Sequence, residues 1–167
     1  PKFKIDGTSG IGKFFLTDAQ KDLFLSDNLP RIRRLTTGYV FDLGFSLLHD
    51  NGVGGSCTFS RYQSSGSGKD YEDKVQLYSF IFSITYLRPL KETKHFLYVS
   101  AGLQKGYVEV EVIENNSRSS ESEEGTGLNI KIGSYLHLHK KLFFNFNAET
   151  YLGGGNINLT VGLSLIF

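Results

Sequence analysis

The sequence predicts an all-β protein, an eight-stranded antiparallel up-and-down β-barrel that crosses a membrane. Three observations lead to this prediction. Apolar and polar residues alternate with a period of two over many segments, which is typical of strands with two different faces. The segments between the predicted strands alternate between short turns and long polar stretches. The polar face carries mostly Gly, Ser, Thr and Asn rather than the Lys and Glu of a water-exposed strand.

Composition agrees with this class. The chain has 167 residues, of which 14% are aromatic and 19 are glycines. That length suits one domain over residues 1–167, and that mixture favours strands joined by glycine-containing turns. With 18 Lys and Arg against 17 Asp and Glu, bulk charge predicts no nucleic-acid partner.

Other features of the composition narrow the class further. A single cysteine, Cys57, excludes an internal disulfide and a CxxC metal site, so we expect neither a metal nor another cofactor. No apolar run is long enough for a membrane helix. A start at Pro1 without a signal peptide is typical of a processed, exported protein.

The predicted strands differ in how clearly they alternate. The last one is the clearest: six apolar residues up to Phe167 share one face, and only Ile166 interrupts the polar face. The first and third strands are weakly patterned, so their register is open. The fifth changes phase near residues 105–106, where a bulge or the membrane rim is expected. In chain order, the strands cover roughly residues 2–15, 39–48, 54–62, 76–87, 96–112, 128–139, 142–152 and 157–167.

The connections alternate in length along the chain. Strands two and three, four and five, and six and seven are joined by tight turns, whereas long polar surface loops are predicted near 17–35, 64–74 and 113–127. The last two strands meet at a short GGGN segment, the one exception. An even number of strands brings both termini to the short-turn end, which is the arrangement of bacterial outer-membrane barrels.

The polar face decides which side of the barrel meets lipid. A small soluble barrel, such as a lipocalin, would alternate in the same way with its apolar face inward. Small polar residues with a few opposite charges suit a crowded interior. Tyr39, Tyr78 and Tyr86 near strand ends are typical of the aromatic girdles of lipid-facing strands. We therefore predict lipid outside, with the soluble barrel as the alternative.

The carboxy-terminal strand carries a resemblance. Its alternation through Leu163 and Leu165 to a final Phe167 resembles the signature that the outer-membrane assembly machinery recognises. With eight strands and alternating connections, nearly the whole chain resembles the small barrels of the OmpA transmembrane-domain, OmpX and NspA type. The resemblance implies a monomer in the bacterial outer membrane, surrounded by outer-membrane lipid. Some members stabilise the envelope, and others are adhesins or capture host complement regulators.

Two groups of residues are candidate sites. An eight-stranded barrel is just wide enough for side chains to fill, so the inward polar residues are expected to form a network that plugs the lumen; a narrow pore is the alternative. These residues are Lys4, Asp6, Asp42, Gln104, Lys131 and Glu149. A second, basic group at the outer rim is either solvated or contacts anionic lipid headgroups or an acidic or sulfated host ligand. It comprises Arg31, Arg33, Arg34, Arg61, Lys74 and Lys105.

The sequence gives little support for a metal site or for a catalytic serine and histidine. His137 and His139 project from the same face of one strand, but further metal ligands are not apparent. Some barrels of this size modify lipids with a serine and a histidine near the outer leaflet. Here the histidines border the short-turn end, and no GxSxG occurs. We expect a non-enzymatic barrel whose surface loops serve envelope integrity or adhesion to host proteins, such as complement regulators or matrix. The alternatives are a narrow pore or, behind it, a lipid-modifying enzyme.

Overall fold

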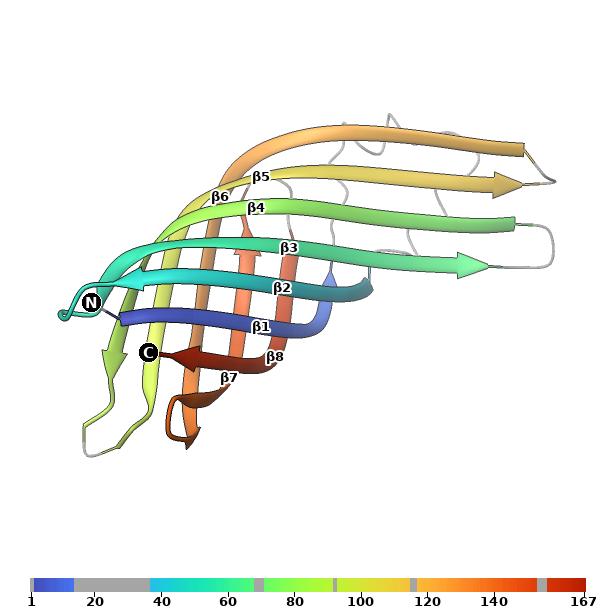
Figure 1. The fold of residues 1–167 in the computed structure, drawn as a ribbon. Helices are drawn as coiled ribbons and strands as arrows, with labels where there is room; N and C mark the ends of the chain where they lie inside the picture. The colour runs from blue at the N-terminus through green and yellow to red at the C-terminus, as the bar shows by residue number, and fades with distance from the viewer. Residues whose placement is uncertain (1, 14–36, 68–70, 92, 115–116, 153–155) are drawn as a thin grey trace.

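The chain forms one closed antiparallel barrel in the order β1 to β8, with β8 paired back onto β1. The computed structural model describes residues 2–13, 37–67, 71–91, 93–114, 117–152 and 156–167. The predicted fold class is confirmed (Figure 1). The strands are β1 (Lys2–Lys13), β2 (Thr37–Leu48), β3 (Val53–Ser67), β4 (Tyr71–Pro89), β5 (Phe96–Glu114), β6 (Ser117–His139), β7 (Leu142–Tyr151) and β8 (Asn156–Ile166).

The four middle strands are longer than the sequence predicts. The loops expected at 64–74 and 113–127 are largely strand, because β3 continues to Ser67, β4 begins at Tyr71, and β5 and β6 run to Glu114 and from Ser117. Their alternation was hard to see because polar residues there occupy both faces. The loop expected at 17–35 lies outside the described residues.

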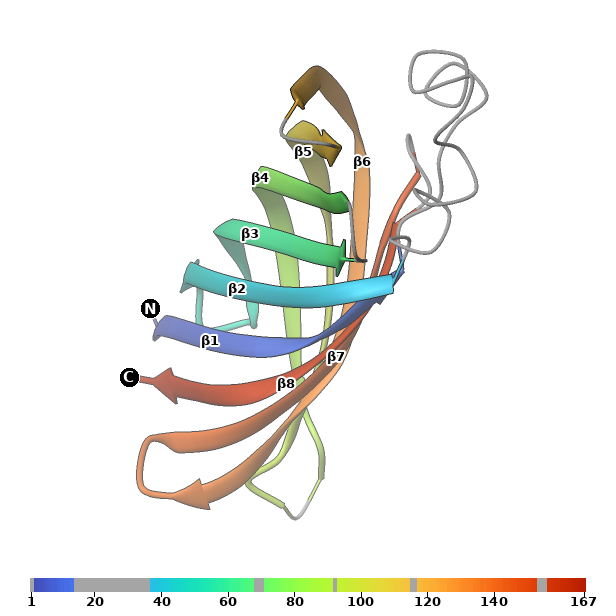
Figure 2. The same ribbon diagram turned by 90° about the vertical axis from the view of Figure 1, so that its right-hand side faces the viewer.

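The outer ends of β3–β6 extend past the other strands as a curved sheet (Figures 1 and 2). We call these ends, residues 64–67, 71–78, 105–114 and 117–127, the projecting sheet. Both termini lie at the opposite end of the barrel, where the Phe167 N–H donates to the Phe3 carbonyl at 2.8 Å. The two ends of the molecule therefore differ in shape.

Tight turns close the short-turn end. Between β2 and β3, Asn51 Oδ1 accepts a hydrogen bond from the Val53 N–H at 3.0 Å. Gly52 adopts a φ of 87°, a conformation that glycine reaches at little steric cost. Lys140, between β6 and β7, is in the left-handed region too, with a φ of 46°.

The register of the weakly patterned strands is continuous. β1 pairs with β2 from Lys2↔Leu48 to Lys13↔Thr37. Its pattern is weak because glycines take inward positions: a Cβ added to Gly12 would lie 2.5 Å from a Val40 methyl carbon. Neighbouring side chains fill the space that a larger residue at position 12 would need.

The outward face of the barrel is apolar and the inward face of its middle is polar. Ile84 is 69% exposed and Leu163 is 53% exposed, whereas Asn147 is 0% exposed and Asp42 is 1% exposed. This is the arrangement expected in lipid, and it excludes the soluble alternative with an apolar interior. The described residues contain no helix long and apolar enough to span a membrane.

No bulge accompanies the phase change predicted in β5. The pairing of β5 with β4 and with β6 continues without a register shift from Phe96 to Glu114. Leu103 and Lys105 are both exposed, and Gln104 and Val108 are both buried. The inward and outward faces of β5 keep their direction, but apolar residues move from the outward face to the inward face. The membrane rim therefore explains the phase change.

Candidate functional site

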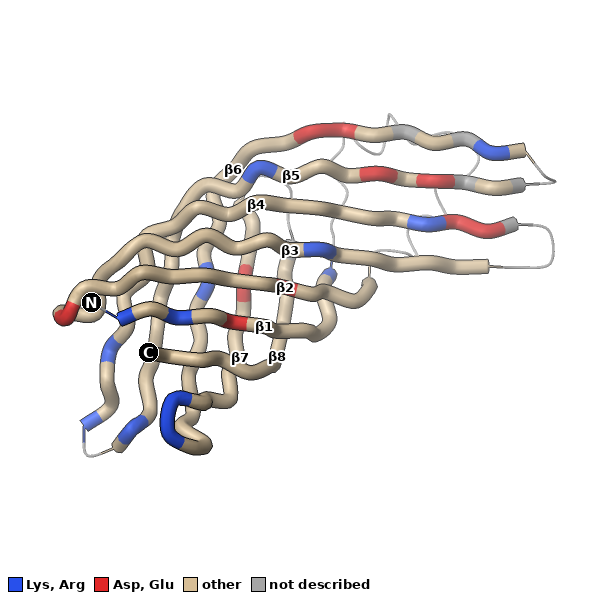
Figure 3. Tube along the Cα trace, in the orientation of Figure 1, with Lys and Arg blue, Asp and Glu red and all other residues tan. Residues whose placement is uncertain are grey.

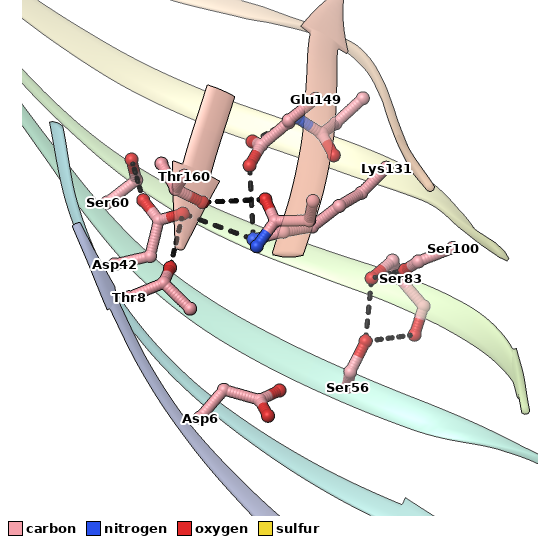
Figure 4. A network of polar contacts seen from close by, with 12 residues as sticks. Asp6, Thr8, Asp42, Ser56, Ser60, Ser83, Ser100, Lys131, Glu149 and Thr160 are labelled. Atoms are coloured by element: carbon pink, nitrogen blue, oxygen red, sulfur yellow. Dashed lines mark hydrogen bonds and ion pairs between the residues drawn. The ribbon is translucent and has the colours of Figure 1, made fainter. Parts of the chain in front are cut away.

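The centre of the lumen holds a buried ion-pair network (Figure 4). Lys131 of β6 lies between two carboxylates: its Nζ is 3.1 Å from Asp42 Oδ2 and 3.2 Å from Glu149 Oε2. Asp42 and Glu149 belong to β2 and β7, so the ammonium group joins opposite walls of the barrel. Charges removed from water need such partners to offset the cost of desolvation.

Neutral polar side chains complete this network. Ser60 donates to Asp42 Oδ1 at 2.6 Å. The Asn129 amide donates to Glu149 Oε1 at 2.6 Å and to Gln104 Oε1 at 2.9 Å. The carboxylates thus accept hydrogen bonds from the lumen wall as well as charge from Lys131, as buried ionised groups require.

A second ion pair lies nearer the short-turn end. Lys4 Nζ is 2.8 Å from Asp6 Oδ2, and the Tyr135 hydroxyl donates to the same oxygen at 3.2 Å. The Lys4 ammonium also lies 5.1 Å from the ring centre of Tyr98 and 4.8 Å from that of Tyr135. All six predicted lumen residues therefore lie inward, in two neighbouring clusters.

Apolar side chains close the lumen at the short-turn end. Tyr98 and Tyr135 stack with ring centres 4.7 Å apart. Ile166, the residue that interrupts the polar face of the last strand, points inward here and is 8% exposed. The cluster consists of Leu48, Leu87, Tyr98, Tyr135, Phe143 and Ile166, with Phe96 packed against it.

A second apolar cluster lies at the other end of the polar network. It contains Val40, Tyr62, Val75, Leu77, Val108 and Val110, and it covers the inward side of the projecting sheet near its base. Between the two clusters, a lumen cavity lined by residues such as Lys4, Ser56 and Ser100 has a volume of about 20 Å³. That volume holds about one water molecule. At this cavity, between the two clusters, the described side chains leave little free space.

Charged residues lie along the strands of the projecting sheet (Figure 3). Lys74 lies 2.9 Å from Glu72, Lys105 lies 3.2 Å from Glu124, and the Arg118 Nε lies 2.8 Å from Glu111. The hydrogen bond and the charge of Glu72 raise the pKa of Lys74 above its ordinary value. Two of the six predicted basic rim residues, Lys74 and Lys105, thus already have acidic partners.

The other basic rim residues divide into two groups. Arg61 lies at the base of the projecting sheet, where it donates to Gln63 Oε1 at 3.2 Å and its guanidinium lies 5.4 Å from the Tyr78 ring centre. Arg31, Arg33 and Arg34 lie outside the described residues.

Among the described strands, the projecting sheet has an open edge along β6. β6 pairs with β5 from Ser117 to Tyr135, but its pairing with β7 begins only at Asn129. No described strand pairs with residues 117–128 on the side away from β5. Unpaired main-chain N–H and C=O groups on such an edge can pair with another strand.

The surroundings of the histidines near the β6–β7 turn and of the single cysteine are simple. His137 donates its main-chain N–H to His95 Nδ1 at 3.0 Å, and its own Nε2 lies 3.1 Å from the Lys140 carbonyl oxygen. The residues that the structure describes contain no cluster of three or more potential metal ligands. Cys57 is free and pairs in register with Phe45 and Phe82, which places it on the lipid-facing side.

Sequence reasoning missed several residues of the lumen network. Asn129 and Ser60 contact the charged groups directly, and Tyr135 lies between the central network and the aromatic closure. Their inward position follows from the alternation. Their partners do not, because those lie on strands distant in sequence.

The comparisons with known proteins agree on the fold. No family model matches the chain, and no curated protein matches it in sequence. Among solved structures, it is similar to Neisserial surface protein A (NspA), with a TM-score of 0.69, 13% identity, and 98% of this chain and 96% of that chain covered. It is also similar to Ail, the attachment invasion locus protein of Yersinia pestis, with a TM-score of 0.61, 16% identity, and 99% and 97% covered.

A third solved structure has the same architecture. The outer membrane protein OprG from Pseudomonas aeruginosa aligns with a TM-score of 0.63 and 14% identity over 99% of this chain and 95% of that chain. The chain thus has the fold of the small eight-stranded outer-membrane barrels, as the sequence predicts. The predicted localisation in the bacterial outer membrane agrees with these matches.

Proposed function

We propose that this chain is a non-enzymatic barrel of the bacterial outer membrane that presents its projecting sheet to proteins outside the cell. The observation that carries this proposal is the open edge of β6 on a sheet that extends beyond the lipid-facing belt. In this proposal the outward apolar face is covered by lipid after assembly by the barrel assembly machinery, and the protein acts as a monomer.

The open edge fits an extended protein segment. A strand that adds to it gains main-chain hydrogen bonds along up to eleven residues, 117–127, because the Leu128 carbonyl already accepts from the Leu152 N–H at 2.8 Å. Glu123 adds a negative charge to this edge, whereas Glu124 already pairs with Lys105. A partner strand with basic side chains would complement that charge, and host matrix proteins or complement regulators are the candidate class.

A sulfated ligand is the second candidate for the same sheet. Ail was solved in complex with the heparin analogue sucrose octasulfate. In this chain, however, the cations Lys74 and Lys105 already pair with carboxylates. A sulfated ligand would have to displace those partners, so an extended protein segment is the better fit.

The lumen supports a structural role rather than conduction. The Lys131 network joins opposite walls, and the cavity beside it has room for about one water molecule. We therefore expect the barrel to resist unfolding and to contribute to envelope integrity. Recordings in planar bilayers should show no steady conductance; a stable single-channel current would favour the pore instead.

Hydrolytic chemistry at the outer leaflet is less well supported. The described histidines, His49, His95, His137 and His139, lie in or beside the turns at the short-turn end. Mass spectrometry of membrane lipids after expression should therefore show no new product.

The adhesion proposal is tested by shortening one hairpin. Val110 and Glu121 pair across β5 and β6, so deleting residues 110–121 removes the end of the projecting sheet and leaves the barrel strands intact. Purified complement regulators and matrix proteins are applied to cells that express either form. We expect the shortened form to lose binding while its heat-modifiable gel band persists. Undiminished binding would refute a role for the projecting sheet.

A further inference from the structure

A groove crosses the lipid-facing surface at the base of the projecting sheet. Its volume is about 530 Å³. Side chains from four adjacent strands line it: Val161 of β8, Ser9 and Ile11 of β1, Tyr39 and Phe41 of β2, and Arg61 of β3. Ile11, Tyr39, Phe41 and Val161 are 60%, 79%, 50% and 42% exposed, so they point outward.

Small residues of β1 create this groove. Ser9 lies in register between Phe41 and Val161. One outward position away, Gly7 lies between Leu43 and Leu163, and a Cβ added there would meet no atom within 4 Å. At Gly7 and Ser9, the outward face of β1 is therefore a narrow depression between two rows of large apolar side chains. Its shape and chemistry fit one acyl chain.

Arg61 supplies a positive charge at the edge of this depression. It pairs in register with Phe41. Its partners are the neutral Gln63 and the ring of Tyr78, and no described carboxylate forms an ion pair with it. The other three outward cations of the projecting sheet, Lys74, Lys105 and Arg118, each pair with a glutamate. Arg61 is thus the described cation of this region that has room for an external anion.

We propose that this groove holds a lipid with a negatively charged phosphate headgroup, its acyl chain lying over Ser9 and Gly7 and its phosphate paired with Arg61. Guanidinium donors match the geometry of phosphate oxygens. The site depends on the lipid-facing belt and is independent of any protein partner of the projecting sheet.

The absence of tryptophan from the chain allows a direct test. Phe41→Trp puts a single fluorophore in the groove wall, and Phe82→Trp, at an outward position of β4 that is 63% exposed, serves as the matched control. Each variant is reconstituted in phosphatidylcholine vesicles that contain a minor fraction of phosphatidylglycerol. In each experiment, the acyl chains of one of the two lipids carry bromine, which quenches tryptophan fluorescence on contact. The quenching of the tryptophan by brominated phosphatidylglycerol is then compared with its quenching by brominated phosphatidylcholine.

We expect phosphatidylglycerol to be enriched about fivefold over phosphatidylcholine at Phe41→Trp, which corresponds to about 1 kcal/mol for one basic residue near a charged headgroup. At Phe82→Trp the two lipids should quench equally. Adding Arg61→Gln should remove the enrichment. Adding Ser9→Leu should lower quenching by both lipids at Phe41→Trp, because the side chain occupies the groove.

Gly7→Leu provides a second groove-filling variant in open space, in case Ser9→Leu does not fold. A heat-modifiable gel band establishes folding for every variant. Equal enrichment at Phe41→Trp and Phe82→Trp would overturn the proposal, since it would reveal only the lipid that surrounds any barrel. Enrichment that survives Arg61→Gln would overturn the assignment of the phosphate to Arg61.

Discussion

The middle parts and the outer ends of the same four strands, β3–β6, have opposite polarity. Within the barrel, outward residues such as Phe82 are apolar and inward residues such as Ser100 are polar. In the projecting sheet, Glu111 and Lys74 face outward, whereas Val110 and Val75 are buried inward. The pairing between β4 and β5 runs without a shift through both regions. The medium outside the sheet, and not the strand geometry, sets which residues each face carries.

The lumen and the projecting sheet also differ in how strongly their ion pairs are expected to stabilise the protein. Lys131 and its two carboxylates are enclosed in the lumen, where a charge without a partner is costly. The pair between Lys105 and Glu124 has side chains that are 67% and 64% exposed, so water and salt screen it. Similar residue types should therefore contribute very differently at the two ends of the strands.

The largest effect is expected in the lumen. Lys131→Met should destabilise the barrel by about 3–5 kcal/mol, because it leaves Asp42 and Glu149 buried together without their cation. Urea unfolding in lipid vesicles measures the change. The triple variant with Asp42→Asn and Glu149→Gln should recover much of the loss, and failure to recover would mean that the charges are not the cause.

The next effect concerns the lipid-facing belt. Leu163→Arg should cost about 2–4 kcal/mol, the range for a cation on the lipid face near mid-membrane. Ser164→Ala, at the adjacent inward position that is 1% exposed, should cost far less. The same urea titration compares them, and similar losses at both positions would contradict the assignment of the two faces.

A smaller effect is expected on the inward side of the projecting sheet. Leu77→Ala should lower local stability by about 2 kcal/mol, because Leu77 is buried in the apolar cluster with Val108 and Val110. Hydrogen exchange of the β4 and β5 amides should become faster. The outward Lys74→Ala should change hydrogen exchange little. If Lys74→Ala has the larger effect, burial of apolar residues on the inward face does not stabilise the projecting sheet.

The smallest effect is expected for the exposed ion pair. A double-mutant cycle of Lys105→Ala and Glu124→Ala should give a coupling below about 1 kcal/mol, and high salt should remove most of it. A coupling as large as that of the lumen network would show that the outer ends are not solvated as the comparison requires.

Much of the fold could be predicted from the sequence because a period of two is a local property. Each apolar run up to Phe167 marks its own strand and its two faces, and the short turns mark one end of the barrel. The inward polar residues, from Lys4 to Glu149, could be selected from the same alternation. A local pattern does not predict which residues on other strands each inward side chain contacts across the barrel.

Tertiary structure decided the rest. The pairing of Lys131 with both Asp42 and Glu149 depends on the closure and register of the barrel. Residues 64–74 and 113–127 of the projecting sheet are predicted as loops because polar residues occupy both faces of the strands there. Ile166 interrupted the pattern for another reason: the lumen is apolar where it closes. A sequence pattern reports a change of polarity, and only the assembled barrel shows whether lipid, water or the lumen lies against each face.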